Sequence, residues 1–173
     1  MTDATAILVD AFGRVNESMH DLLADLEPAA LLWRPDPEAN PIGWVAWHLS
    51  RVQDDHLAGV GQTPQVWTEW GFAERFALPY PVAAVGYGQT AAEVGQFAVE
   101  DPVLLLDYHD AVHERTLAVL AGLDDAGYAR IVDKRWDPPV TAAVRLVSVV
   151  GDTLMHLGQI GYLRGLFERH AAG

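Results

Sequence analysis

Four polar residues recur at helical spacing in an apolar stretch near the C-terminus. The stretch TAAVRLVSVVGDTLMHLGQIGYLRGLFER contains Ser148, Asp152, His156 and Gln159, spaced four, four and three residues apart. Residues at these spacings lie on one face of a helix. Asp152 and His156 are one turn apart, as in helices that offer two ligands to a single metal ion. The pattern predicts either a metal site or a metal-free network of hydrogen bonds between helices.

A third metal ligand would have to come from another part of the chain. His48, in WVAWHLSRVQDDHLAGV, is the best candidate because it lies among apolar residues in the middle of a second predicted helix. The alternative is a histidine packed and hydrogen-bonded in the core. Asp55 returns to nearly the same helix face seven residues later. The rise of roughly 10 Å between them is too large for both side chains to bind one ion, so Asp55 is predicted to support the ligands, to line a pocket or to lie on the surface.

Other histidines and carboxylates are weaker candidates. Asp54 and His56 point further round the second helix and are predicted to lie mostly on the surface. His109 and His113, in YHDAVHER, form a rival pair four residues apart. Their charged neighbours predict that this pair is exposed.

A pocket around the site would need walls, and aromatic residues could supply them. Residues 61–100 form a long connection with many aromatic residues, prolines and glycines, which predicts a packed loop over either the mouth of a pocket or only the end of the helices. For the tryptophans, the alternative to lining a pocket is plain core packing. Arg145, one turn before Ser148, could bind the carboxylate of a cosubstrate or be a surface cation. The candidate wall residues are Trp44, Trp47, Trp67 and Trp70.

Four segments with apolar residues every three or four positions predict the helices that position these residues. They span residues 8–26, 40–61 with Asn40 as cap, 101–122 with Asp101 as cap, and about 141–169. A further short helix is predicted within residues 65–76. The fold class is therefore all-α: a single domain over residues 1–173, arranged as an up-down four-helix bundle with a long crossover between the second and third helices. The fourth helix is apolar nearly all round, so we expect it to be buried.

Composition excludes several classes of function. The 173 residues are half apolar and contain 24 Asp and Glu against 11 Lys and Arg, a net charge of −13 that argues against nucleic-acid binding. The chain has no cysteine, so disulfides, thiolate metal ligands and a cysteine nucleophile are excluded. Without a secretory signal or a long apolar run, we expect a cytoplasmic protein that does not interact with membranes.

The segments WRPDPEANPIGWVAWHLSRVQDDH and GDTLMHLGQIGYLRGL together resemble the DinB-like metalloenzymes. In this family a histidine of the second helix and two residues one turn apart on the last helix hold a metal ion. The resemblance implies that His48, Asp152 and His156 are ligands, and that the protein is a homodimer. The family's usual last-helix pattern is His-x-x-x-His followed by Gln, so Asp152 is a departure. The related mycothiol-dependent isomerases are similar in using a carboxylate there.

Two imidazoles and a carboxylate with an open position suit a catalytic zinc ion, and they also suit non-haem iron. Zinc is our first choice, with nickel or iron as alternatives. The resemblance implies chemistry with low-molecular-weight thiols such as mycothiol or bacillithiol. Because the chain has no cysteine, such a thiol must arrive as a cosubstrate. We therefore expect a metal-dependent small-thiol S-transferase or isomerase acting on a small electrophile. The alternatives are a metal-dependent hydrolase and a non-catalytic, stress-related metal-binding protein.

Overall fold

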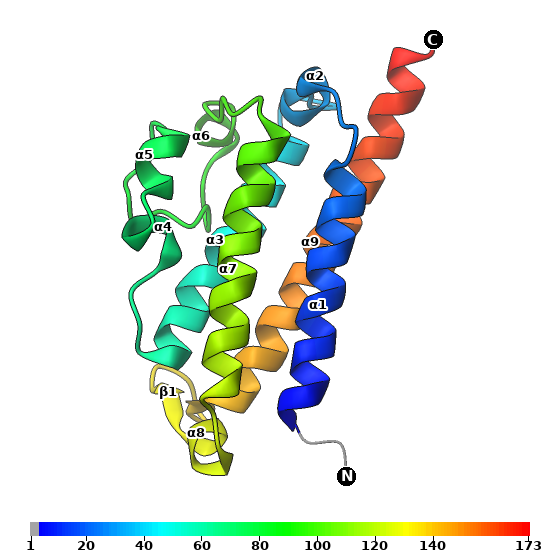
Figure 1. Cartoon of the computed structure of the whole chain (residues 1–173). Coiled ribbons are helices and arrows are strands. Elements are labelled where there is room, and N and C mark those ends of the chain that lie inside the picture. Colours follow the sequence, from blue (N-terminus) through cyan, green and yellow to red (C-terminus); the bar gives the residue numbers. More distant parts are fainter. Residues whose placement is uncertain (1–3) are drawn as a thin grey trace.

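The computed structural model describes residues 4–173, and within them four helices have twenty or more residues (Figure 1). They are α1 (Ala4–Leu23), α3 (Ile42–Gly61), α7 (Pro102–Ala121) and α9 (Ala142–Ala171). These are the four helices that the apolar periodicity predicts, and the protein is all-α apart from one small sheet. Among residues 4–173, no helix is long and apolar enough to cross a membrane.

The order of helix directions differs from the predicted up-down alternation. Helices α1 and α3 each pack against both α7 and α9. Helices α1 and α9 run in one direction, whereas α3 and α7 run in the other (Figure 1). The long connection over residues 62–101 returns the chain to the end at which α3 began. As a result α3 lies beside α9, so residues of the second and last long helices can meet.

Shorter elements fill the connections. Helix α2 (Pro28–Leu32) precedes α3, and the long connection contains α4 (Val66–Glu69), α5 (Phe72–Phe76) and α6 (Ala91–Val94). The single short helix predicted over residues 65–76 is split into α4 and α5, because Gly71 adopts a left-handed φ of 73° between them. Helix α8 (Asp125–Ala129) and an antiparallel hairpin of β1 (Ile131–Asp133) and β2 (Val140–Thr141) precede α9.

Side chains cap the starts of two of the long helices, α7 and α9. The Asp101 side chain accepts a hydrogen bond from the Val103 amide at 2.9 Å, as predicted for the start of α7. Thr141 caps α9 by accepting from the Val144 amide at 3.3 Å. The predicted Asn40 cap of α3 is wrong. Pro41 occupies the capping position in an extended conformation, so the helix begins one residue later.

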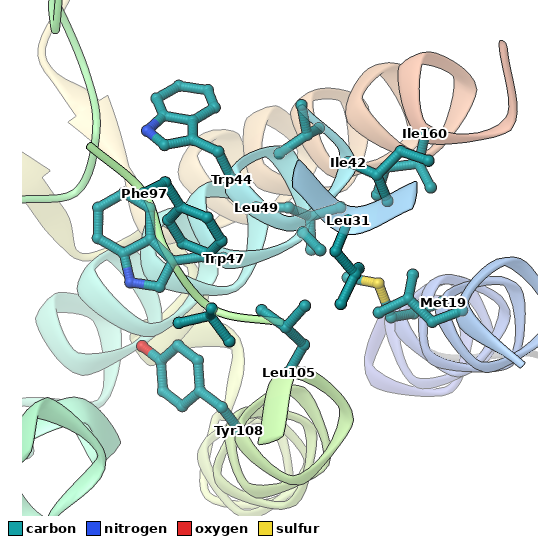
Figure 2. Close-up of a cluster of buried hydrophobic side chains, with 14 of the residues drawn as sticks. Met19, Leu31, Ile42, Trp44, Trp47, Leu49, Phe97, Leu105, Tyr108 and Ile160 are labelled. Atoms are coloured by element: carbon teal, nitrogen blue, oxygen red, sulfur yellow. The ribbon is translucent and has the colours of Figure 1, made fainter. Parts of the chain in front are cut away.

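The core consists of two apolar clusters. The larger one surrounds the first half of α3, and Figure 2 shows Trp47, Phe97 and Tyr108 gathered on one side of it. The smaller one lies near α8 and includes Phe12 and Leu146. Several buried polar residues on the long helices belong to neither cluster: Ser50, Gln53, His109, Thr116 and Thr153.

Helix α9 is not buried all round, which corrects the prediction from its apolar composition. Its apolar residues on the side away from α1 and α3 are at least half exposed, because each helix of such an arrangement keeps one outward face. The exposed residues are Val144, Val147, Leu154, Met155 and Tyr162.

Candidate metal centre

His48, Asp152 and His156 come together where α3 packs against α9. Nε2 of His156 lies 3.6 Å from Oδ2 of Asp152. The rings of His48 and His156 meet edge to face, with centroids 4.8 Å apart. Zinc bonds of about 2.0–2.2 Å would place two ligand atoms roughly 3.3 Å apart, so the His156–Asp152 spacing is close to that of a ligand pair. Residues 4–173 nevertheless contain no group of three or more His, Asp or Glu side chains already arranged to hold an ion, so a metal ion would have to draw these three inward.

Hydrogen bonds on the far side of each imidazole determine which nitrogen is free. Nδ1 of His48 contacts the carbonyl oxygen of Val85, which can only accept, so Nδ1 donates the proton. Nδ1 of His156 likewise donates to Oε1 of Gln159 at 3.0 Å. In a neutral imidazole this arrangement leaves the lone pair on Nε2, as in metal-ligating histidines whose other nitrogen is oriented by a carbonyl or carboxylate. Gln159, predicted to support a ligand, thus accepts a hydrogen bond from His156.

The surroundings of the Asp152 carboxylate favour binding of a cation beside it. Within the described chain its Oδ2 atom is buried and has no hydrogen-bond partner. A buried acceptor without a partner is costly, and more so when it is charged. Burial lowers the pKa of His48, and more than the bond to Val85 raises it, so this imidazole is neutral and able to bind a metal. These three residues suit a divalent ion.

The orientation of His48 is fixed from both sides. Trp44 stacks on its ring at 4.8 Å with an interplanar angle of 17°. Gly86 packs against it with a φ of 91°, and a Cβ atom there would lie 2.7 Å from Nδ1 of His48 and 2.9 Å from Trp44. Only glycine combines this φ with such a close approach. The sequence reasoning did not identify Val85 and Gly86, although the glycines of VGYG were a signal for an unusual backbone.

Asp54 ties the long connection to α3, which corrects its predicted surface position. Its side chain is 1% exposed and accepts bonds from the amides of Val66 and Trp67, both at 2.8 Å. The Tyr108 hydroxyl donates to it at 2.9 Å, and Arg51 lies 3.5 Å away. Arg51 also donates to the carbonyl of residue 84, next to Val85. This buried group therefore places the backbone that orients His48.

A cavity of about 690 Å³, here called the α3–α9 cavity, extends from the candidate metal site. His56, predicted to lie mostly on the surface, is partly buried and lines this cavity. Asp55 and Ser148 also line it, and Asp55 accepts a bond from Gln65 at 2.7 Å. The remaining wall comes from both helices, residues 85 and 87, and the hairpin. The lining residues are His48, Val52, Asp55, His56, Val85, Tyr87, Asp133, Arg135, Trp136, Arg145, Ser148, Val149 and Asp152.

The four tryptophans predicted as wall residues are not in this lining. Trp47 and Trp67 are buried in the core and Trp44 packs on His48, so core packing accounts for these three. Trp70 is 42% exposed beside Arg115. The aromatic side chains of the cavity are instead Tyr87 and Trp136. Trp136 lies in the β1–β2 hairpin, a segment too short to show strand periodicity.

The rival pair on α7 is separate from this site. His109 is fully buried, so its predicted exposure is wrong, and its Nδ1 lies 3.1 Å from the Ser50 hydroxyl. Burial lowers the pKa of His109 to about 3. Its charged sequence neighbours face outward while His109 itself faces α3. His113, one turn later, is only partly buried.

Comparison with known proteins found one family profile and a similar solved structure. The sequence profile of the DinB superfamily matches residues 11–160. The chain is also similar to a solved structure described as a conserved protein from Enterococcus faecalis. The two share 29% identity over 95% of this chain and 96% of that one, with a TM-score of 0.87. No curated protein matches the chain. From the extent of the profile match, the chain belongs to the DinB superfamily.

Proposed function

We propose that this protein is a metal-dependent enzyme that activates an external small thiol and directs it at an electrophile, as an S-transferase or isomerase. A single divalent ion, zinc in the first instance, would bind His48, Asp152 and His156. The observation that carries this proposal is the buried Oδ2 of Asp152, which lies beside Nε2 of His156 and accepts no hydrogen bond within the described residues. When bound, zinc would lower the pKa of a thiol or of water in its open position.

The chain's own residues would orient the ligands and shape the space. Val85 and Gln159 hold the two imidazoles through their Nδ1 atoms, which leaves both Nε2 atoms for the metal ion. Trp44 and Gly86 prevent the His48 ring from rotating. Val52 and Val149 give part of the cavity an apolar wall, which would limit access of water to a reactive group.

The cavity size supports a small-molecule substrate. A volume of about 690 Å³ lies within the range of small-molecule sites, about 300–1,000 Å³. Because the chain has no cysteine, any thiol in this cavity must come from outside. The cavity therefore suits a low-molecular-weight thiol together with a small electrophile.

We expect the metal-loaded protein to consume mycothiol, bacillithiol or glutathione in the presence of a chlorinated aromatic electrophile. Loss of thiol should be faster than with the His48→Ala variant, which lacks one proposed ligand. In cobalt-substituted protein, the accepted thiol should change the visible spectrum. If no thiol perturbs that spectrum, thiol transfer is wrong. Hydrolysis of ester or amide substrates by the same protein would then favour the hydrolase alternative.

We also propose that the protein is a homodimer joined along α9. The outward face of α9 carries a seam of Val144, Val147, Gly151, Leu154, Gly158 and Tyr162, spaced three or four residues apart. A Cβ atom at Gly151 or Gly158 would meet nothing within 4 Å, so another helix could approach closely. No exposed residue of α9 between 144 and 162 is charged, although the chain carries a net charge of −13. Charge depletion is typical of interface cores, and a second copy presents the same apolar seam.

Replacing Leu154 by glutamate should convert the dimer into a monomer, because a charge would be buried in the centre of the seam. Light scattering on wild type should give twice the chain mass of 18.9 kDa, and the variant should give that mass once. The matched control is Ile7→Glu, which alters an exposed apolar residue on α1. A monomeric wild type, or an unchanged Leu154→Glu dimer, would contradict this interface.

A further inference from the structure

We propose that the end of the α3–α9 cavity away from the candidate metal site binds the carboxylate of the substrate, through Arg145 and Arg135. The proposal deepens the proposed function, because that carboxylate would belong to the molecule on which the enzyme acts. Arg145 lies two turns before Asp152 on the same face of α9, a rise of roughly 10 Å. The substrate would therefore be elongated, with its anionic group well separated from its reacting atom.

The two guanidinium groups are held in place by one carboxylate. Oδ2 of Asp133 accepts from Nη2 of Arg135 and from Nη2 of Arg145, both at 2.9 Å. Oδ1 of Asp133 accepts from the Arg135 amide and from its Nε atom, at 2.9 and 3.0 Å. Asp133 is itself nearly buried. It therefore fixes both cations at the cavity wall without using all of their donors.

Arg145 retains unused hydrogen-bond donors that border the cavity. Within residues 4–173 its only side-chain hydrogen bond is the one from Nη2 to Asp133, whereas a guanidinium has five N–H donors. Its side chain is only 16% exposed and lines both the α3–α9 cavity and the smaller hollow beside it. A partly buried guanidinium with free donors suits a carboxylate, which it can bind through two parallel bonds.

The charge distribution supports an anionic ligand at this place. The chain has only 11 Lys and Arg residues, yet two of them line this cavity and Lys134 borders the adjoining hollow. The carboxylates that line the same cavity are Asp133, which is paired with both arginines, Asp55, which accepts a bond from Gln65, and Asp152 at the metal-site end. Since Asp152 lies at the other end, the arginines give this end of the cavity, and not the cavity as a whole, a local preference for anions.

Aromatic groups beside the arginines indicate what the rest of the ligand is like. Tyr87 and Trp136 line the cavity although their side chains are 92% and 65% exposed. Their exposed rings can pack against an apolar or planar body that enters between them. The ligand class is therefore a carboxylate attached to an apolar, preferably planar, group.

Binding of benzoate to the metal-free protein tests this proposal, with neutral benzamide as the matched ligand. Isothermal titration calorimetry should show benzoate binding at least about tenfold more tightly than benzamide, since a charge-assisted hydrogen bond is favoured by that order. Arg145→Gln and the more exposed Arg135→Gln should each remove the preference. Arg14→Gln is the control, because Arg14 forms an exposed pair with Asp10 on α1, away from the cavity.

The outcomes separate this proposal from the proposed function. Equal affinity for benzoate and benzamide, or no measurable binding of either, would overturn the carboxylate site. A benzoate preference that survives in both the Arg145→Gln and Arg135→Gln variants would also overturn it. Since no metal and no thiol are present, failure of the thiol experiment would leave this result unchanged. A circular dichroism melt of each variant confirms that it is folded before titration.

Discussion

Replacing His156 by alanine is expected to abolish stoichiometric zinc binding. The variant would retain His48 and Asp152, which come from different helices and cannot hold an ion firmly by themselves. The substitution would also remove the Nε2 atom that lies 3.6 Å from Oδ2 of Asp152. Elemental analysis after dialysis against zinc should show the metal in wild type and only traces in the variant. His113→Ala is the matched control, because it removes a helical histidine from the rival pair on α7.

A smaller loss of zinc affinity is expected when the hydrogen-bond acceptor of His156 is removed and the imidazole itself is kept. In Gln159→Ala, Nδ1 of His156 loses the acceptor that orients the ring. Such partners typically contribute about 10- to 100-fold to metal affinity, so the site should weaken without disappearing. Full occupancy in His156→Ala would contradict the proposed ligand set, as would loss of the metal in His113→Ala alone.

Replacing Asp54 by alanine is expected to produce the largest loss of stability, about 3–5 kcal/mol in the free energy of unfolding, as for a broken buried ion pair. The change removes the acceptor for the Val66 and Trp67 amides and for the Tyr108 hydroxyl. It also leaves Arg51, which is fully buried, without its carboxylate. Urea denaturation at neutral pH measures the difference.

Asp101→Ala is the control, because it also removes a carboxylate that accepts a hydrogen bond from a backbone amide. Asp101 is exposed and caps α7 through the Val103 amide, and removing such a cap costs about 1 kcal/mol. If Asp54→Ala costs no more than Asp101→Ala, the buried group does not hold the long connection to α3. In that case another explanation would be needed for the position of Val85 beside His48.

The long helices and the proximity of Asp152 to His156 could be predicted because their signals are local. Apolar residues every three or four positions define each helix, and a spacing of four places Asp152 and His156 on one face. The direction of α7 could not be predicted in this way. It depends on the path of residues 62–101, whose short helices are positioned by contacts from distant parts of the chain.

The buried polar residues were mispredicted for a similar reason. Asp54 and His109 have charged or polar sequence neighbours, which indicate exposure when only the local sequence is considered. Their partners are 12 to 59 positions away: the Val66 amide and the Tyr108 hydroxyl for Asp54, and Ser50 for His109. The acceptor for His48 is a backbone carbonyl, a group that every residue carries and that no side-chain motif reveals.

Zinc titration of metal-free wild-type protein by calorimetry is the most direct test of a metal site between α3 and α9, because it measures stoichiometry and affinity without assuming a substrate. We expect one ion per chain. His48→Ala and Asp152→Ala should each remove this binding while the protein stays folded. Absence of zinc binding by wild type, or the same affinity in both variants, would contradict a metal site between α3 and α9.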